Sequence, residues 1–214
     1  MRSLVRPRLP AKLVAFPAAA PGPGRDDLAT MRSLPGLTVV APADGPTTRA
    51  ATVALAEREG PAYLRLPAAD APSVSDGTFA VGRAREARAG SDLAIVSLGR
   101  PLARALEVAD ELARVGVSVR VLDVASVKPF DEAAVLRAAR DTGAILVVED
   151  APVGGGVGTL VAAMTAENHP VPVRRVARPD VWSDAGDEPG DTGVSLDRIR
   201  DEAWELLRLR GRLA

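Results

Sequence analysis

The sequence predicts an α/β protein with two doubly wound, mostly parallel sheets, and three observations lead to this fold class. Short runs rich in Val, Ile and Leu alternate along the chain with amphipathic segments of helical period. One run, Ala144 to Val148, is continuously apolar, as in a parallel strand that is buried on both faces. After Glu149 and Asp150, a glycine-rich turn from Gly154 to Gly158 opens a helix. Such a turn lets a strand and a helix approach closely in an open α/β sheet.

Composition excludes several classes of function. The 214 residues, 47% hydrophobic and 26% charged, are those of an ordinary globular protein with room for one large or two small domains. The net charge of -1 gives no argument for binding nucleic acid or an anionic membrane. With no cysteine and one histidine, His169, the chain has no thiolate chemistry, disulfide or His-pair metal site. No apolar run reaches the length of a membrane span, so we expect a cytoplasmic protein with neither kind of partner.

The first unit alternates strand, helix, strand, helix and strand. Its expected strands are Lys12 to Phe16, Leu37 to Val40 and Ala62 to Leu66. Asp26 and Asp27 suit the positive start of the first helix. Asp44 or Gly45 is the expected cap of the second helix, which reaches about Glu59. We assign this half of a doubly wound sheet to a partial domain of residues 1–70.

Residues 71–90 are assigned to a linker because the segment begins with polar and proline-bearing sequence. A second domain of residues 91–214 follows, with strands expected at 93–98, 117–124, 144–148 and 171–176. The apolar stripe of its first helix is expected to be Leu102, Leu106, Ala109 and Ala113. Asp131 and Ser195 are the expected caps of later helices. Because strands and helices alternate, both sheets should be parallel with right-handed crossovers.

Five segments in order resemble the end of a transketolase-type thiamine diphosphate enzyme. They are Asp26 to Asp44, Gly60 to Leu66, Ser91 to Gly99, Val121 to Asp131 and Val148 to Gly158. Deoxyxylulose-phosphate synthase shares this order of segments, but the sequence motifs Met-Arg-Ser-Leu-Pro and Pro-Ala-Asp are most similar to those of split transketolases. The resemblance covers nearly the whole chain. It implies a partial pyrimidine-binding domain followed by a transketolase C-terminal domain.

The resemblance also implies that catalytic equipment is missing. A complete pyrimidine-binding domain would begin roughly eighty residues earlier, and that part carries the family's activating glutamate and the aromatic residues around the coenzyme ring. Gly22 and Ala151 stand where the family has histidines. We therefore expect no catalytic, cofactor-binding or metal-binding residue in this chain. Arg65 alone matches a family substrate contact, an arginine that pairs with a sugar phosphate, and Arg25 is a weaker candidate for a replaced cation.

Other polar groups have a functional and a structural interpretation. Asp123, Glu149 and Asp150 should lie at the carboxyl edge of the second sheet, where acids could bind a cation or exchange protons. Because neighbouring residues on a strand point to opposite faces, a structural or subunit-contact role is favoured. The turn from Gly154 to Gly158 suggests anion binding, although it lacks dinucleotide spacing. His169 is expected in an exposed loop. The acidic segment Asp180 to Asp191 is expected to be solvated rather than a calcium site.

The implied function is that of a C-terminal component of a multi-chain transketolase-like enzyme, which moves a two-carbon ketol unit between sugars or related carbonyl compounds. Thiamine diphosphate and Mg²⁺ would be held mainly by partner chains in a hetero-oligomer. Those partners would be a coenzyme-binding N-terminal subunit and a chain that supplies the missing half-domain. The alternatives are a non-catalytic assembly or regulatory protein derived from a transketolase end, and an enzyme fragment read from an internal Met1. A half sheet should also leave one edge unpaired and one apolar face uncovered.

Overall fold

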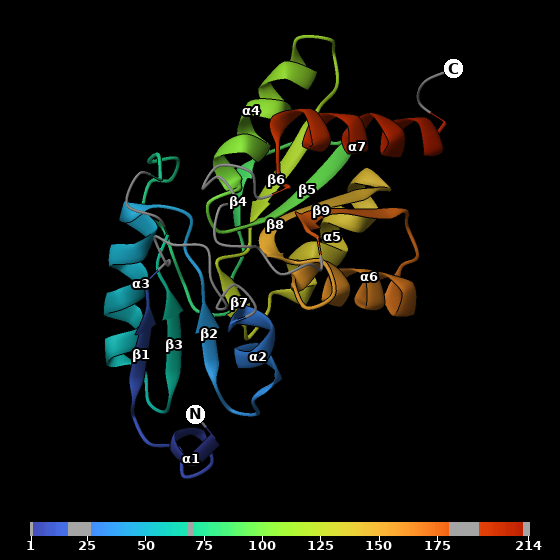
Figure 1. Cartoon of the computed structure of the whole chain (residues 1–214). Coiled ribbons are helices and arrows are strands. Elements are labelled where there is room, and N and C mark those ends of the chain that lie inside the picture. The colour runs from blue at the N-terminus through green and yellow to red at the C-terminus, as the bar shows by residue number, and fades with distance from the viewer. Residues whose placement is uncertain (1, 17–26, 68–70, 180–192, 212–214) are drawn as a thin grey trace.

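The computed structural model describes residues 2–16, 27–67, 71–179 and 193–211, which form two sheets with helices around them (Figure 1). The first sheet has the strand order β1 (Lys12–Ala15), β3 (Ala62–Arg65), β2 (Thr38–Val40) and β7 (Ser126–Lys128). The strands β1, β3 and β2 are parallel, as predicted. The fourth strand, β7, comes from the C-terminal half and runs antiparallel to β2. The expected half sheet is therefore closed on one side by a strand that we did not predict.

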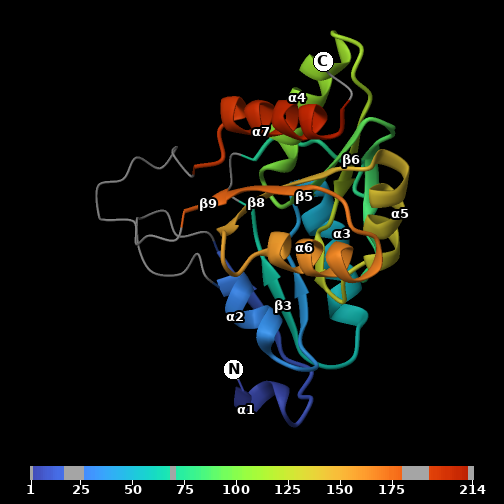
Figure 2. The same ribbon diagram turned by 90° about the vertical axis from the view of Figure 1, so that its right-hand side faces the viewer.

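Short helices flank the first sheet. The turn α1 (Arg2–Val5) precedes β1, while α2 (Asp27–Ser33) and α3 (Gly45–Glu57) lie on opposite faces of the sheet (Figures 1 and 2). The predicted cap of α3 is confirmed, because Asp44 Oδ1 accepts a hydrogen bond from the backbone N–H of Thr47 at 3.0 Å.

The second sheet is five-stranded. Its order is β4 (Arg85–Arg88), β6 (Val119–Asp123), β5 (Leu93–Leu98), β8 (Ile145–Pro152) and β9 (Val173–Arg178). The four predicted strands of this half run parallel, and β4 is an antiparallel addition at the edge. Residues 85–88 of the segment assigned to a linker thus belong to the sheet. Their polar sequence hid the strand, since β4 is a half-buried edge without an apolar pattern.

Helices cover both faces of the second sheet. One face packs against α4 (Leu102–Ala113) and α7 (Leu196–Leu209), and the other against α5 (Glu132–Thr142) and α6 (Val157–Asn168). The caps Asp131 and Ser195 are confirmed, because each side chain accepts a bond from the backbone N–H three residues on. The predicted stripe of α4 is partly wrong: Leu106 is only half-buried and Ala113 is exposed. The buried face is instead Leu102, Ala105, Val108, Ala109 and Leu112, because α4 packs against α7 as well as the sheet.

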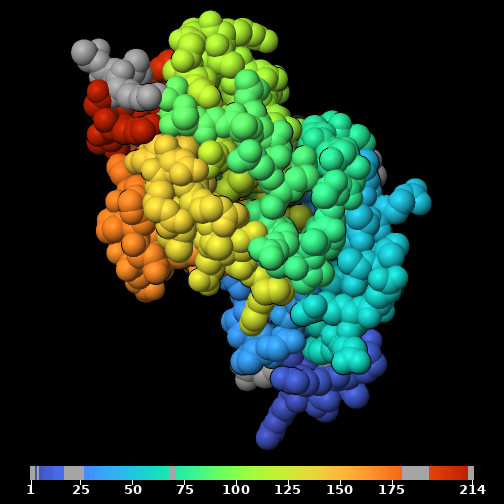
Figure 3. All heavy atoms as spheres, turned by 180° about the vertical axis from the view of Figure 1, so that it is seen from behind, coloured from blue at the N-terminus to red at the C-terminus, as the bar shows by residue number. Residues whose placement is uncertain are grey.

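One hydrophobic cluster joins the two halves of the molecule. It contains Val39 and Tyr63 of the first sheet together with Val96 and Val147 of the second. In the space-filling view from behind, the green segment around residues 75–95 lies between the cyan first half and the yellow second half (Figure 3). The halves are therefore packed on each other, and the first sheet depends on the second for part of its core. In the part of the chain that the structure describes, no helix is long and apolar enough to cross a membrane.

Candidate functional site

The end of β3 meets β8 and the end of β9 at a cluster of charged residues. Arg65 is the last residue of β3, Asp150 lies in β8, and Arg178 is the last residue of β9. Asp27 at the start of α2 and Tyr63 of β3 complete the group, which we call the Arg65 cluster. The predicted location of Arg65 at the end of a strand is confirmed, and the cluster brings it into contact with the second half of the molecule.

The guanidinium of Arg65 is held between two acids. Its Nη1 donates to the backbone oxygen of Asp150 at 3.1 Å, and its Nη2 lies 3.8 Å from Asp150 Oδ2. On the other side, Arg65 Nε lies 3.8 Å from Asp27 Oδ2, which also accepts the Tyr63 hydroxyl at 2.5 Å. Arg178 Nη1 lies 3.7 Å from Asp150 Oδ1, so Asp150 is shared by two arginines.

The Arg65 cluster is close to electrically neutral and largely shielded from water. Its two guanidinium groups face two carboxylates, and the four charged side chains are only 12–26% exposed. Burial, together with the hydrogen bond to Asp27, raises the pKa of Tyr63 well above its usual range, so the hydroxyl stays protonated. A phosphate that approached Arg65 would have to compete with Asp27 and Asp150 for the guanidinium.

Glu149 fills the anion site that the glycine-rich turn forms. Its carboxylate is fully buried and accepts the backbone N–H groups of Val157 at 2.6 Å and Gly158 at 2.9 Å, at the start of α6. Burial raises the pKa of Glu149, and these two hydrogen bonds oppose that shift. A Cβ at Gly156 would lie 2.0 Å from Glu149 Oε2, so glycine is required there. The anion expected at this helix start is thus the chain's own carboxylate, and we correct the suggestion of a ligand site.

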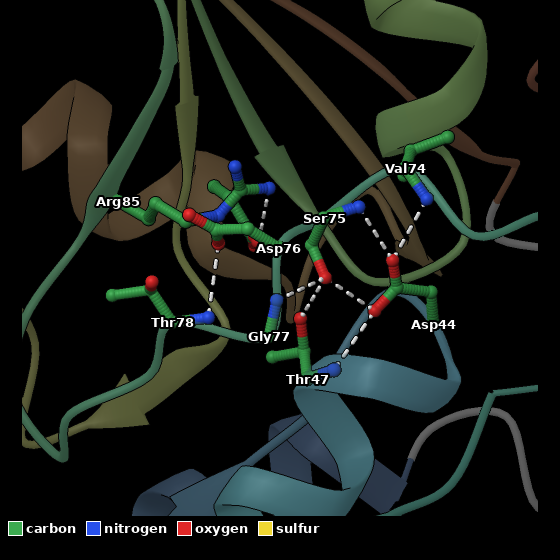
Figure 4. A network of polar contacts seen from close by, with 9 residues as sticks. Asp44, Thr47, Val74, Ser75, Asp76, Gly77, Thr78 and Arg85 are labelled. Atoms are coloured by element: carbon green, nitrogen blue, oxygen red, sulfur yellow. Dashed lines mark hydrogen bonds and ion pairs between the residues drawn. The ribbon is translucent and has the colours of Figure 1, made fainter.

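A second polar network joins α3 to the segment that leads into the second sheet (Figure 4). Asp44 Oδ2 accepts the backbone N–H groups of Val74 and Ser75, each at 2.8 Å, in addition to the cap bond from Thr47. Ser75 Oγ donates to Asp44 Oδ1 at 2.8 Å. Burial alone would raise the pKa of Asp44, but these hydrogen bonds outweigh it and hold the pKa below its usual value. Asp44 therefore caps α3 and also connects the first half to the segment that leads into the second sheet.

Asp123 lies at the end of β6 and pairs with Arg85 of β4. The distance between Asp123 Oδ2 and Arg85 Nη2 is 3.4 Å, and the Asp123 side chain is only 2% exposed. Burial raises the pKa of Asp123 to about 6, and the guanidinium of Arg85 opposes part of the shift. Asp123, Glu149 and Asp150 have separate partners, Arg85, the start of α6 and the Arg65 cluster. The structural role that strand geometry favoured for Glu149 is confirmed.

The remaining candidates contribute little to a site. His169 is the C-cap of α6, where its backbone N–H donates to Thr165 O at 2.9 Å, and it is half-buried rather than exposed. Gly22, Arg25 and the acidic segment Asp180 to Asp191 lie outside the described residues.

Comparison with known proteins gives the family. Residues 82–191, more than half of the chain, match the family described as transketolase, C-terminal domain. The chain belongs to the transketolase family. Over 164 residues it is 43% identical to the 6-deoxy-6-sulfo-D-fructose transketolase subunit SqwH of Clostridium sp. (strain MSTE9), covering 75% of this chain and 51% of that one. Over 157 residues it is 37% identical to an apulose-4-phosphate transketolase subunit of Phocaeicola vulgatus (strain ATCC 8482), covering 72% and 50%.

A solved structure agrees with this family over almost the whole chain. It is described as a split gene transketolase, an inactive β4 tetramer, with a TM-score of 0.90 and 36% identity. The match covers 97% of this chain and 70% of that chain. This transketolase-family chain thus spans about half the length of the curated relatives it matches, and the similar fold extends over 97% of it.

The Arg65 cluster does not fit the family's coenzyme or its metal ion. Within residues 2–16, 27–67, 71–179 and 193–211, no group of three or more Asp, Glu or His side chains could hold a cation. Tyr63 is the aromatic residue of the Arg65 cluster, but it is 6% exposed and its hydroxyl is bound to Asp27, so it offers no free ring face.

Sequence reasoning found Arg65 but missed its partners. Tyr63 could have been found, because residues two apart on a strand share a face. The sequence pattern predicts only a helix start at Asp27 and indicates no role for Arg178. The contact from Arg65 to Asp150 spans 85 positions of sequence and needed the packing of the two halves.

Proposed function

We propose that this chain is a C-terminal component of a multi-chain, transketolase-like enzyme that transfers a two-carbon ketol unit between sugars or related carbonyl compounds. The observation that carries the proposal is the match of 97% of this chain to a split gene transketolase of which it covers only 70%. The two curated relatives are themselves described as subunits, which supports a divided enzyme. Each complete enzyme would therefore contain more polypeptide than this chain supplies.

The proposed partners are a thiamine diphosphate-binding N-terminal subunit and a chain that provides the rest of the pyrimidine-binding domain, in a hetero-oligomer. Thiamine diphosphate supplies the carbon nucleophile for ketol transfer when it is bound. Partner chains would hold the coenzyme and Mg²⁺; in support, the described residues of this chain contain no cation cluster, and the Tyr63 ring of the Arg65 cluster is buried. The similar split gene transketolase is described as inactive in its β4 form, and we propose that this chain is likewise inactive by itself.

Arg65 is the proposed contribution of this chain to substrate binding. Its side chain is 16% exposed. The distances from Nε to Asp27 Oδ2 and from Nη2 to Asp150 Oδ2, both 3.8 Å, are longer than hydrogen bonds, while Nη1 is bound to Asp150 O at 3.1 Å. An incoming phosphate could therefore take bidentate bonds from Arg65 while Asp27 and Asp150 keep the guanidinium in place.

The alternative is a non-catalytic assembly or regulatory protein. The observation that favours it is the balanced charge of the Arg65 cluster, in which two carboxylates already neutralise Arg65 and Arg178. In that case Arg65 connects the two halves of the molecule and does not bind a substrate.

Steady-state kinetics of the reconstituted complex tests the proposal. Removing a charge-assisted hydrogen bond costs about 1.5–3 kcal/mol, so Arg65→Ala should lower kcat/KM for a phosphorylated acceptor roughly ten- to hundredfold. Arg65→Lys should rescue only in part because it loses the bidentate fork. The matched control is an unphosphorylated acceptor, on which the substitution should have little effect. Equal losses on both acceptors would exclude a role of Arg65 in binding the phosphate. Ketol transfer by the pure chain would contradict the proposal of a divided enzyme.

A further inference from the structure

A cavity of about 470 Å³ lies where the first half of the molecule meets the second. Its walls come from the end of α2, from β7, from the segment that leads into α5 and from the start of α6. Figures 1 and 2 both show α2 beside the start of α6. The lining includes Arg32, Lys128, Phe130, Glu132, Thr159 and Leu160. The volume is in the range of sites that bind small molecules.

Two cations line this cavity, and neither is neutralised by a bound acid. Arg32 Nη2 donates to Thr159 Oγ1 at 3.3 Å. Lys128 Nζ donates to the backbone oxygens of Arg32 at 3.0 Å and Leu34 at 2.7 Å, which uses two of its three protons. In the parts of the chain that the structure describes, these side chains thus bind a hydroxyl and backbone oxygens but no carboxylate.

The two cations are close enough to repel each other. Burial and the positive charge of Arg32 both lower the pKa of Lys128. Glu132 also lines the cavity, but it is exposed, so solvent screens its charge. The charge of Arg32 also acts on Glu149, whose two oxygens are already bound to backbone N–H groups at the start of α6. An anion between Arg32 and Lys128 would relieve their repulsion.

The donor groups indicate which anion fits. A guanidinium presents paired N–H donors, and an ammonium adds a donor from another direction, which together suit the three oxygens of a phosphate ester. Phe130 and Leu160 give the same cavity an apolar part. We propose that this cavity binds a phosphate monoester of a small aromatic or apolar molecule. The phosphate lies between Arg32 and Lys128, and the organic group packs against Phe130 and Leu160.

This site is separate from the Arg65 cluster. Arg32 lies in the last turn of α2, whereas Asp27, which belongs to the Arg65 cluster, is the first residue of that helix. The cavity lining and the Arg65 cluster share no residue. A ligand that binds Arg32 should nevertheless stabilise α2, because it links this helix to the start of α6. The inference goes beyond the proposed function and does not depend on ketol transfer.

Titration calorimetry of the full chain with phenyl phosphate tests the site. We expect saturable binding with a dissociation constant below about 1 mM. Benzoate, which has a single carboxylate, and inorganic phosphate, which has no ring, should each bind about tenfold more weakly or worse. Hydrogen exchange should decrease in α2 and at the start of α6 when phenyl phosphate is present. An absence of saturable binding, or equal affinity for either of the two other anions, would overturn the proposal.

Substitutions in the cavity assign the binding to these residues. Arg32→Gln removes the charge and should lower the affinity for phenyl phosphate about tenfold or more. The matched control is Arg114→Gln, at an exposed position after α4, which should leave the affinity unchanged. If Arg32→Gln fails to fold, Leu160→Glu provides the second test, since it keeps both cations and places a negative charge in the cavity. Full affinity in either folded cavity variant would overturn the proposal.

Arg65→Ala distinguishes this site from the proposed substrate contact. We expect the affinity for phenyl phosphate to stay unchanged, because Arg65 does not line the cavity. Binding that is lost in Arg65→Ala but kept in Arg32→Gln would assign the phosphate to Arg65, which overturns the cavity site while the proposed function stands. Failure of ketol transfer in the reconstituted complex would contradict the proposed function and leave the binding result unaffected.

Discussion

The second sheet carries helices on both faces, and its order runs from an antiparallel β4 to β9. The first sheet has a short α2 on one face and α3 on the other, and β1 is its outermost strand, with β3 as its one partner among the described strands. Val39 and Tyr63 of the first sheet are buried in the same cluster as Val96 and Val147 of the second. The difference indicates a division of labour, in which the second half is a folded support and the first half packs part of its core against it.

Glu149 offers the strongest test of the second half as the support. Glu149→Ala would leave the buried N–H groups of Val157 and Gly158 without an acceptor, at a cost of roughly 2–6 kcal/mol in unfolding free energy. Because the halves share a core, both should unfold together. Glu149→Gln should lose less, since its amide oxygen keeps one acceptor. Denaturant unfolding followed by circular dichroism measures the loss, and a change below about 1 kcal/mol for the alanine variant would contradict the site.

Substitutions at three adjacent glycines distinguish packing within the second half from packing against the first half. At Gly156 a Cβ would meet Glu149 Oε2 at 2.0 Å, at Gly155 it would meet Ala29 Cβ of α2 at 2.4 Å, and at Gly154 it would meet nothing within 4 Å. Overpacking typically costs about 1–3 kcal/mol, which we expect for Gly156→Ala and Gly155→Ala. Only Gly155→Ala should increase hydrogen exchange selectively in α2. Gly154→Ala is the control, with a change within about 0.5 kcal/mol, and a loss there equal to the others would refute the assignment.

Asp123 makes the junction between β4 and β6 sensitive to pH. Its pKa in the folded protein is raised from 3.8 to about 6, so the native state binds more protons than the unfolded state between these values. The stability contributed by this group is therefore greatest at low pH and decreases by about 2–3 kcal/mol as pH rises from about 4 to about 6.

Unfolding titrations across this pH window check that slope. Asp123→Asn should flatten it, because the amide does not titrate. Asp76→Asn is the matched control, since the hydrogen bond from the backbone N–H of Thr78 lowers the pKa of Asp76, the opposite direction to the shift of Asp123. An unchanged slope in the Asp123→Asn variant would assign the pH dependence to another group.

Lys12 is expected to give the smallest effect, confined to the first half. Lys12→Met removes the bonds from Nζ to the oxygens of Arg58 and Gly60 after α3 and should cost about 1 kcal/mol. Hydrogen exchange should increase at the end of α3 and leave β5 and β8 unchanged. Lys12→Arg should restore part of the loss. Faster exchange in β5 would mean that the first half supports the second, the reverse of the division of labour between the two sheets.

Local features of the fold could be predicted from the sequence alone. Residues 93–98 form β5 with the predicted bounds, and Asp44, Asp131 and Ser195 cap the helices as expected. Consecutive apolar residues predict a buried parallel strand. A helix cap is also predictable, because it needs only a side chain and a backbone N–H three positions away. The end-of-strand position of Arg65 was predictable for the same reason.

Only the tertiary structure decided how these pieces meet. Neither β4 nor β7 has an apolar pattern of its own. Their antiparallel pairing therefore depends on the strands beside which the fold places them, β6 for β4 and β2 for β7. The acceptor for the amides of the glycine turn is Glu149, eight and nine positions earlier, which β8 places under α6. Arg65 reaches Asp150 across 85 positions because the two halves share one core. Contacts between residues so far apart in sequence arise from packing, and residue periodicity does not predict them.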